Sequence, residues 1–482
     1  MCTILLAIFC LPMFANNIAL GTATLTDENV TEGCVYVTFD VTWEHSWRMS
    51  SGASNWDAAW LFVKYRVGGV GGEWLPAHLH NTGHTAGTGT AADITVGLLD
   101  DNVAFDATSN PGIGAFVNRS SAGTGTFTNT GLKLRWDYNA DGIAGGSNVE
   151  VQVFAIEMVR VLEGAFNVGG GGGNSAFTST TISTADATTA PSGTGSLGGE
   201  AGGYPTGQTV PENASWPNGY AGFYCMKYEV SQQQYVDFLN TLTQTQADAR
   251  KYTLDPLDSR YAITGSTVGS YATTNPNVAC NYLGWADDVA YADWSGLRPM
   301  TELEFEKACR GPEGAVVGEY AWGTADVASS AYTLSDDGFA SEGIASNYGT
   351  TAGNAMYSVT VGTIGGPLRV GIFAAHGLNS GRVSAGASYW GIMELSGNLW
   401  ERPVTIDNGT GRAFTGTHGD GVLAGSGDAN AATWPGTDSV GAGWRGGSWI
   451  DDTDYMQVSD RYIAGYSYSY RFSIIGFRAV RR

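Results

Sequence analysis

The chain has 482 residues, 69 of them glycine, and only 15% of its residues are charged. Glycine at about twice its usual share and charge well below its usual share exclude a coiled coil or a helical bundle, because glycine weakens helices and charge solvates their surfaces. The formal net charge of −22 repels the phosphates of nucleic acids, so no nucleic-acid partner is expected.

Residues 1–15 predict a signal peptide. Their apolar run from Thr3 to Ala15 is too short to span a bilayer, and a cut near Ala15 fits it, although the usual basic start is absent. We therefore expect a secreted or cell-surface protein with no transmembrane span. Beyond this segment no cysteine lies in a Cys-x-x-Cys pair, so buried thiols are expected at Cys34, Cys225, Cys280 and Cys309.

Residues 16–155 read as an all-β domain. Apolar residues alternate with other residues in the stretches 35–43, 61–67, 132–136 and 149–153, a pattern that buries one face of a strand. Several such strands within about 140 residues indicate a β-sandwich of the immunoglobulin or fibronectin kind. Asp137, Asn139 and Asp141 have the spacing of the first half of a calcium loop, and the alternative is a plain Asp-Gly hairpin turn.

The sequence changes character at residues 168–215, which are rich in glycine, serine and threonine. Composition alone predicts a flexible linker there. Further on, three helices are predicted: one capped by Ser231 with Gln234, one over residues 285–294, and one capped by Thr301 with Glu304 and closed by Gly311. The rest of the chain shows little periodicity, so we expect long ordered loops or bound ions to hold it together.

Seven blocks of sequence carry a family resemblance. They are residues 157–166, 226–231 (Met-Lys-Tyr-Glu-Val-Ser), 297–306, 320–323, 391–401 (ending Gly-Asn-Leu-Trp-Glu), 445–449 (Arg-Gly-Gly-Ser-Trp) and 476–478 (Gly-Phe-Arg). In this order they resemble the formylglycine-generating enzyme, or sulfatase-modifying factor, family. The resemblance implies an α+β, C-type-lectin-like fold for residues 156–482, irregular with short helices and small sheets. It also makes the Gly-rich stretch of about 168–215 an insertion within that domain.

The resemblance argues against the family's oxidase chemistry. Family enzymes hold copper through two cysteines that follow the Arg-Gly-Gly-Ser block, and these positions align with Asp451 and Met456. Because copper(I) needs thiolate ligands, neither copper nor catalysis is expected here. The iron-binding branch of the family is not expected either, because His376 and His418 lie far apart in the sequence.

Calcium is the metal that the resemblance implies. Its ligands would be the backbone carbonyls of Glu394, Gly397 and Leu399 and the side chain of Glu401. Hard oxygen ligands of this kind suit calcium. The alternative is that Glu401 caps a turn.

Residues 450–475 interleave six aromatic side chains with aspartate and serine, a composition typical of antibody-like binding surfaces. The alternative is a β-strand with an inward aromatic face. The segment resembles the variable region of proteins diversified by retroelements, with Arg445, Trp449, Arg461 and Arg478 as framework. The ligand-binding positions implied are Ile450, Asp451, Asp452, Asp454, Tyr455, Tyr462, Ile463, Tyr466, Tyr468, Tyr470, Phe472 and Ile474.

Together these features predict a non-enzymatic, surface-displayed protein that binds a protein or glycan ligand on another cell or surface. Two alternatives belong to other classes. One is a family-related oxidase or metal-dependent enzyme, and the other is a self-assembling structural surface protein. The sequence does not specify an oligomeric state.

Overall fold

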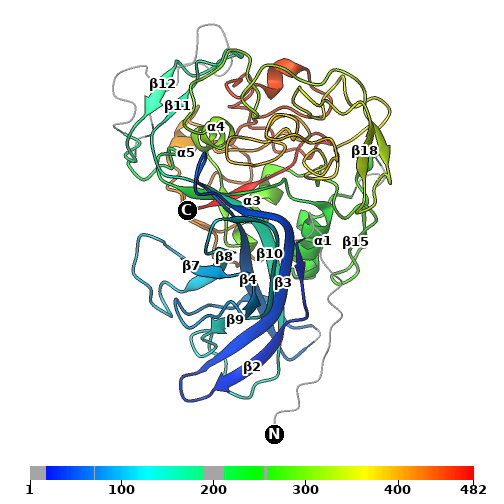
Figure 1. Ribbon diagram of the computed structural model, residues 1–482. Helices are drawn as coiled ribbons and strands as arrows, with labels where there is room; N and C mark the ends of the chain where they lie inside the picture. The colour runs from blue at the N-terminus through cyan, green and yellow to red at the C-terminus, as the bar shows by residue number, and fades with distance from the viewer. Residues whose placement is uncertain (1–17, 70, 189–210, 212, 254–257) are drawn as a thin grey trace.

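The computed structural model of the protein describes residues 18–482 except 70, 189–210, 212 and 254–257 (Figure 1). The signal peptide predicted for residues 1–15 lies outside the described residues. In the described part of the chain, no helix has the length and apolar character needed to cross a membrane. The fold is a mixture of short helices, several antiparallel sheets and long loops.

The N-terminal third supplies most strands of two facing sheets, and its strands are drawn in blue and cyan in Figure 1. Side chains that alternate along the strands meet between the two sheets, among them Phe39, Trp43, Leu61 and Leu134. The five-stranded sheet contains β1 (Ala19–Leu20), β2 (Thr24–Asn29), β3 (Cys34–Arg48), β6 (Thr88–Gly89) and β9 (Gly123–Trp136). The eight-stranded sheet contains β4 (Asp57–Val67), β5 (Leu75–Pro76), β7 (Ala92–Leu98), β8 (Gly112–Arg119), β10 (Val149–Val161), β13 (Phe223–Met226), β16 (Arg298–Pro299) and β19 (Ala479–Arg481).

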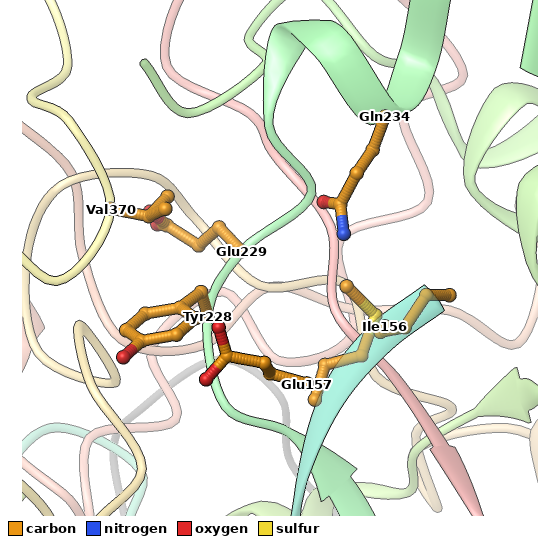
Figure 2. Close-up of a pocket in the computed structure, with 7 residues that line it drawn as sticks. Ile156, Glu157, Tyr228, Glu229, Gln234 and Val370 are labelled. Atoms are coloured by element: carbon orange, nitrogen blue, oxygen red, sulfur yellow. The ribbon is translucent and has the colours of Figure 1, made fainter. Parts of the chain in front are cut away.

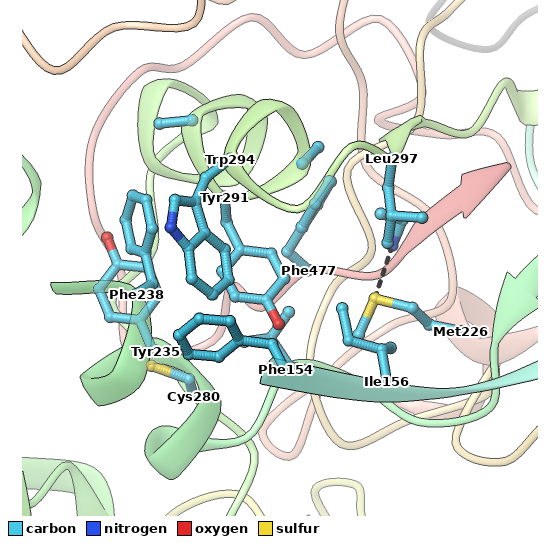
Figure 3. Packing of buried hydrophobic residues seen from close by; sticks show 14 of the residues in the cluster. Phe154, Ile156, Met226, Tyr235, Phe238, Cys280, Tyr291, Trp294, Leu297 and Phe477 are labelled. Carbon is cyan, nitrogen blue, oxygen red and sulfur yellow. Dashed lines mark hydrogen bonds between the residues drawn. The ribbon is translucent and has the colours of Figure 1, made fainter. Parts of the chain in front are cut away.

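The eight-stranded sheet continues across the predicted domain boundary. That boundary, between residues 155 and 156, falls inside β10, which pairs with β4 from Val149 to Val159 and with β13 from Met158 to Val161. The face of this sheet turned away from the N-terminal core carries large aromatic side chains. Figure 3 shows Phe154 of this face packed with Trp294 and Phe238, which come from helices later in the chain.

The three predicted helices are confirmed. They are α1 (Gln232–Asn240), α3 (Trp285–Trp294) and α4 (Glu302–Arg310), and the capping boxes of Ser231 and Thr301 are formed. Two further helices are α2 (Gln244–Arg250) and α5 (Gly409–Arg412), and 3-10 turns cover Asp258–Arg260 and Thr453–Met456. Small two-stranded sheets pair β11 (Phe166–Val168) with β12 (Thr180–Ile182), β14 (Ile263–Thr264) with β15 (Ala272–Thr273), and β17 (Thr333–Ser335) with β18 (Gly343–Ser346).

The glycine run at residues 169–173 is packed into the protein, so the flexible linker that composition predicts is wrong here. The backbone N–H of Gly169 donates to the Glu306 carboxylate at 2.8 Å, and that of Gly171 donates to the Ser459 hydroxyl at 3.3 Å. Side chains from other parts of the domain therefore accept hydrogen bonds from the backbone of this run, because glycines have no side chains that could do so. The cysteines predicted to be buried thiols, Cys34, Cys225, Cys280 and Cys309, are all buried and free.

Candidate binding surface

The aromatic residues of segment 450–475 lie on a loop. Apart from the 3-10 turn at Thr453–Met456, the described segment has no regular structure, and Tyr462, Tyr468, Tyr470 and Phe472 are 44%, 44%, 64% and 40% exposed. The alternative of a strand with an inward aromatic face is therefore wrong, because the chain from Ser467 to Tyr470 is exposed at every residue.

Ring contacts join these side chains to a buried base. Trp400 and Trp444 form the base, and Tyr455 and Tyr466 cover it at half-buried positions. Ring centroids lie 5.4 Å apart between Trp444 and Tyr466 and 4.2 Å apart between Tyr466 and Tyr468. We call the connected set the aromatic surface: Trp400, Trp444, Tyr455, Tyr462, Tyr466, Tyr468, Tyr470 and Phe472.

Two arginines fix the loop that carries this surface. Arg461 donates to both oxygens of Glu302, at 2.7 and 3.0 Å, and its guanidinium lies 3.7 Å from the ring centroid of Phe177. Arg471 donates to both oxygens of Asp287 in α3, at 2.6 Å each. Such paired bonds between guanidinium and carboxylate hold orientation as well as position. Arg461 is a predicted framework residue, whereas Arg471, the other basic residue of the segment, is not among the predicted ones.

Backbone contacts hold the loop between these arginines and the last strand. The carbonyl of Phe472 accepts from the N–H of Tyr282 at 3.0 Å, and the carbonyl of Ser473 accepts from the Trp449 indole at 3.0 Å. Rings such as Tyr470 therefore project from a backbone that is already positioned. A surface ordered in advance loses less entropy when it binds a partner.

The other predicted ligand-binding positions border the aromatic surface. Asp452, Asp454 and Ile450 are exposed, and Ile463 and Ile474 are half-buried against the tryptophan base. All twelve positions are exposed or half-buried. Of the four predicted framework residues, Arg445, Arg461 and Arg478 are buried and Trp449 is half-buried.

The two positions aligned with the family's copper cysteines have different surroundings. Asp451 is half-buried and accepts a hydrogen bond from the Ser448 hydroxyl at 2.5 Å, and burial raises the pKa of its carboxyl. Met456 is fully buried and packs with Tyr320 and Trp322. In the described part of the chain, no three His, Cys, Asp or Glu side chains are grouped so that they could hold a metal.

The side-chain carboxylates expected to bind calcium at Glu401 and Asp141 are bonded to protein donors. Glu401 is buried and accepts from Arg478 at 2.6 Å, and burial raises the pKa of its carboxyl. In the N-terminal third, Asp141 accepts from the Trp136 indole at 2.6 Å and from His78. Calcium at either place would have to displace these donors, and both sites stay predictions.

A small pocket lies beside β10, and the residues that line it come from outside segment 450–475 (Figure 2). The carboxylates of Glu157 and Glu229 line it together with Tyr228. Glu157 accepts from Lys227 at 3.0 Å, and Glu229 accepts from the N–H of Leu399 at 2.9 Å. Because Glu157 bonds β10 to Lys227 and Glu229 bonds two loops to each other, we assign the pocket a structural role.

The part of the chain that carries the aromatic surface is similar to known proteins. A family model described as "Sulfatase-modifying factor enzyme 1-like domain" matches residues 155–482. The formylglycine-generating enzyme of Thermomonospora curvata is 46% identical over 55 residues, which amount to 11% of this chain and 18% of that enzyme. The chain thus matches less than a fifth of that relative's length.

Proposed function

The chain belongs to the sulfatase-modifying factor family through residues 155–482, and from this premise we propose that it is a binding protein, not an enzyme, whose aromatic surface contacts the ligand. The observation that carries the proposal is the placing of four exposed rings, Tyr462, Tyr468, Tyr470 and Phe472, on a loop fixed by Arg461 and Arg471. Exposed aromatic clusters are costly in water and mark interaction sites.

The residues at the two positions where family oxidases have their copper-binding cysteines support the same proposal. Asp451 offers a hard oxygen that is already bonded to Ser448, and the thioether of Met456 is buried in the core. A carboxylate and a buried thioether do not make a copper(I) site. We therefore propose that no copper or iron acts here, and that calcium, where bound, has a structural role at Glu394–Glu401.

We also propose that the residues of this surface differ between variants of the protein, while the C-type-lectin-like scaffold that carries them is kept. The twelve positions implied by the resemblance are all exposed or half-buried, so replacing them leaves the buried framework in place. We propose that the protein acts outside the cell, on a protein or glycan of another surface. A near-copy of the 3′ end of the gene, differing at adenines and lying beside a reverse transcriptase, is the expected genomic signature.

Selection of peptides tests the binding role directly. A library of random linear peptides is panned on the full chain and on the double variant Tyr468→Ala/Tyr470→Ala. We expect peptides that bind the natural chain and lose at least tenfold in affinity on the variant. Because both side chains are exposed, the free energy of unfolding should change by less than ~1 kcal/mol.

The matched control replaces exposed apolar residues elsewhere in the chain. Phe339 and Leu378 are 69% and 60% exposed and lie outside the aromatic surface. The double variant Phe339→Ala/Leu378→Ala should bind the selected peptides like the natural chain. Equal binding by all three proteins would show that the aromatic surface does not make the contact.

A further inference from the structure

The charges in the loop that carries the aromatic surface differ between its interior and its exterior. The bases between residues 446 and 475 are Arg461 and Arg471, and both are bonded to buried carboxylates of other segments. On the exterior, Asp452 and Asp454 carry exposed carboxylates and Asp451 a half-buried one. The exposed charge of this loop is therefore negative.

These exterior carboxylates have no cationic partner in the part of the chain that the structure describes. Asp451 accepts from the Ser448 hydroxyl and Asp452 from the Ser358 hydroxyl, at 2.5 and 2.9 Å. Both donors are neutral, so neither hydrogen bond pairs its carboxylate with a cation. Buried carboxylates of the same domain differ, because Glu302, for example, is paired with Arg461.

The carboxylates of Asp451 and Asp452 lie near a pair of tyrosine rings, because their charge acts on the hydroxyl of Tyr455. Tyr455 and Tyr462 meet at 6.0 Å with an angle of 66° between their planes, so they form two walls of an open corner. Burial raises the pKa of the Tyr455 hydroxyl, and Tyr462 and then Asp451 raise it further by their charge. Asp452 acts on it in the same direction. We call Asp451, Asp452, Tyr455 and Tyr462 the acidic corner.

We infer that the acidic corner binds a lysine or arginine side chain of a protein partner, while Tyr468, Tyr470 and Phe472 cover apolar parts of that partner. Aromatic faces and carboxylates both attract a cation, and a ring corner lets the cation meet both at once. The net charge of −22 draws a basic surface toward the whole molecule before contact. A neutral glycan would use the rings but not this charge. The inference rests on the proposed binding function and adds the class of partner.

The peptides selected on the natural chain provide the probe. We expect them to be enriched in lysine and arginine over the unselected library. Replacing their arginine by citrulline, which keeps the shape and removes the charge, should weaken binding at least tenfold. The double variant Asp451→Asn/Asp452→Asn should lose the same factor, and the difference between arginine and citrulline peptides should disappear on it.

A matched variant separates local charge from total charge. Glu313→Gln/Asp336→Asn removes two exposed carboxylates outside the aromatic surface and should keep the full preference for arginine over citrulline. Thermal melting of every variant checks that it is folded. Asp451→Glu retains a carboxylate and should keep part of the preference for arginine over citrulline that Asp451→Asn/Asp452→Asn loses.

Each other outcome has a definite meaning. Peptides without basic enrichment that still need Tyr468 and Tyr470 would overturn the acidic corner and leave the binding function standing. Peptides that bind Tyr468→Ala/Tyr470→Ala as well as the natural chain would overturn the binding function itself. If panning on the natural chain recovers no peptide above the level recovered on Tyr468→Ala/Tyr470→Ala, the inference of a protein partner is wrong.

Discussion

Arg471 determines where the exposed rings lie, because it lies between two of them and reaches into the protein. Its guanidinium donates to both oxygens of Asp287 and to the carbonyls of Ala249 and Lys251, at 2.7 and 3.1 Å. Its neighbour Tyr470 is 64% exposed. Adjacent residues of one loop thus have opposite tasks, one anchoring the backbone and the other facing solvent.

The variant Arg471→Met tests this division. It leaves the buried Asp287 without its main partner, and breaking a buried ion pair from one side costs about 3 kcal/mol. Arg250, whose Nη1 lies 3.4 Å from Asp287, compensates part of this loss. The neighbouring Tyr470→Ala should cost less than ~1 kcal/mol. Denaturant unfolding measures both, and equal losses would contradict the anchoring role.

Residue roles were predictable where the sequence carries a family block. Arg445, Arg461 and Arg478 were named as framework, and each is buried against a glutamate. The role of Arg471 could not be predicted, because its partner Asp287 lies 184 residues earlier in the chain. No local pattern carries a pairing over that distance.

At the scale of elements, local signals predicted helices well and composition misled about the glycine run. The capping boxes of α1 and α4 need only four neighbouring residues, so the sequence contains them whole. The same signal at Thr243 and Gln246, which begins α2, was overlooked. The order of residues 169–173 depends instead on Glu306 and Ser459, which composition does not reveal.

Neighbouring glycines of this run provide a matched pair of variants. Both have positive φ, +78° at Gly172 and +87° at Gly173. A Cβ at Gly172 would make ordinary contacts with Val317 at 3.7 Å and with the backbone nitrogen of Gly318 at 3.8 Å, whereas at Gly173 it would lie 2.8 Å from the backbone nitrogen of Asp460. Gly172→Ala should therefore cost about 1 kcal/mol for its backbone conformation alone.

Gly173→Ala should cost at least ~1 kcal/mol more, because the backbone at Asp460 must shift as well. Arg461 follows Asp460 directly, so this variant should also disturb the aromatic surface and weaken peptide binding. Gly172→Ala should leave binding unchanged. If the two variants lose the same stability, the glycine run does not pack as described.

At the scale of the whole molecule, the two sequence regions share one sheet. Every residue of β4 from Ala58 to Val63 is buried. Trp60 and Phe62 face the helices, and Leu61 and Val63 face the N-terminal sheet. The alternation of residues 61–67 alone predicts one buried face. The unbroken apolar run is the signal for a strand covered on both faces.

Lys64 belongs to this shared sheet and binds the later part of the chain. Its side chain is 1% exposed, and its Nζ donates to the carbonyl of Gly421 at 2.6 Å. Burial lowers the pKa of Lys64 to about 7, and the charges of Asp293 and Asp420 offset part of this effect. A lysine in the unfolded chain has a pKa of about 10.4, so between these values the folded protein binds fewer protons.

The sign of the pH dependence follows from this difference in bound protons. When the unfolded state binds more protons, stability rises with pH, by at most about 1.4 kcal/mol per pH unit for one group. The Lys64 contribution should thus raise the free energy of unfolding as pH increases from 7 to 9.5. The variant Lys64→Met removes the charge and should flatten this rise.

The contribution of Lys307 to this rise should remain in Lys64→Met, because burial also lowers the pKa of Lys307 to about 7. Lys133→Met, on the five-stranded sheet, is the control and should follow the natural chain. Denaturant unfolding at pH 7, 8 and 9.5 gives the three curves. Parallel curves for the natural chain and Lys64→Met would mean that water or an anion reaches Lys64. The sheet between the two regions would then be more open than its packing indicates.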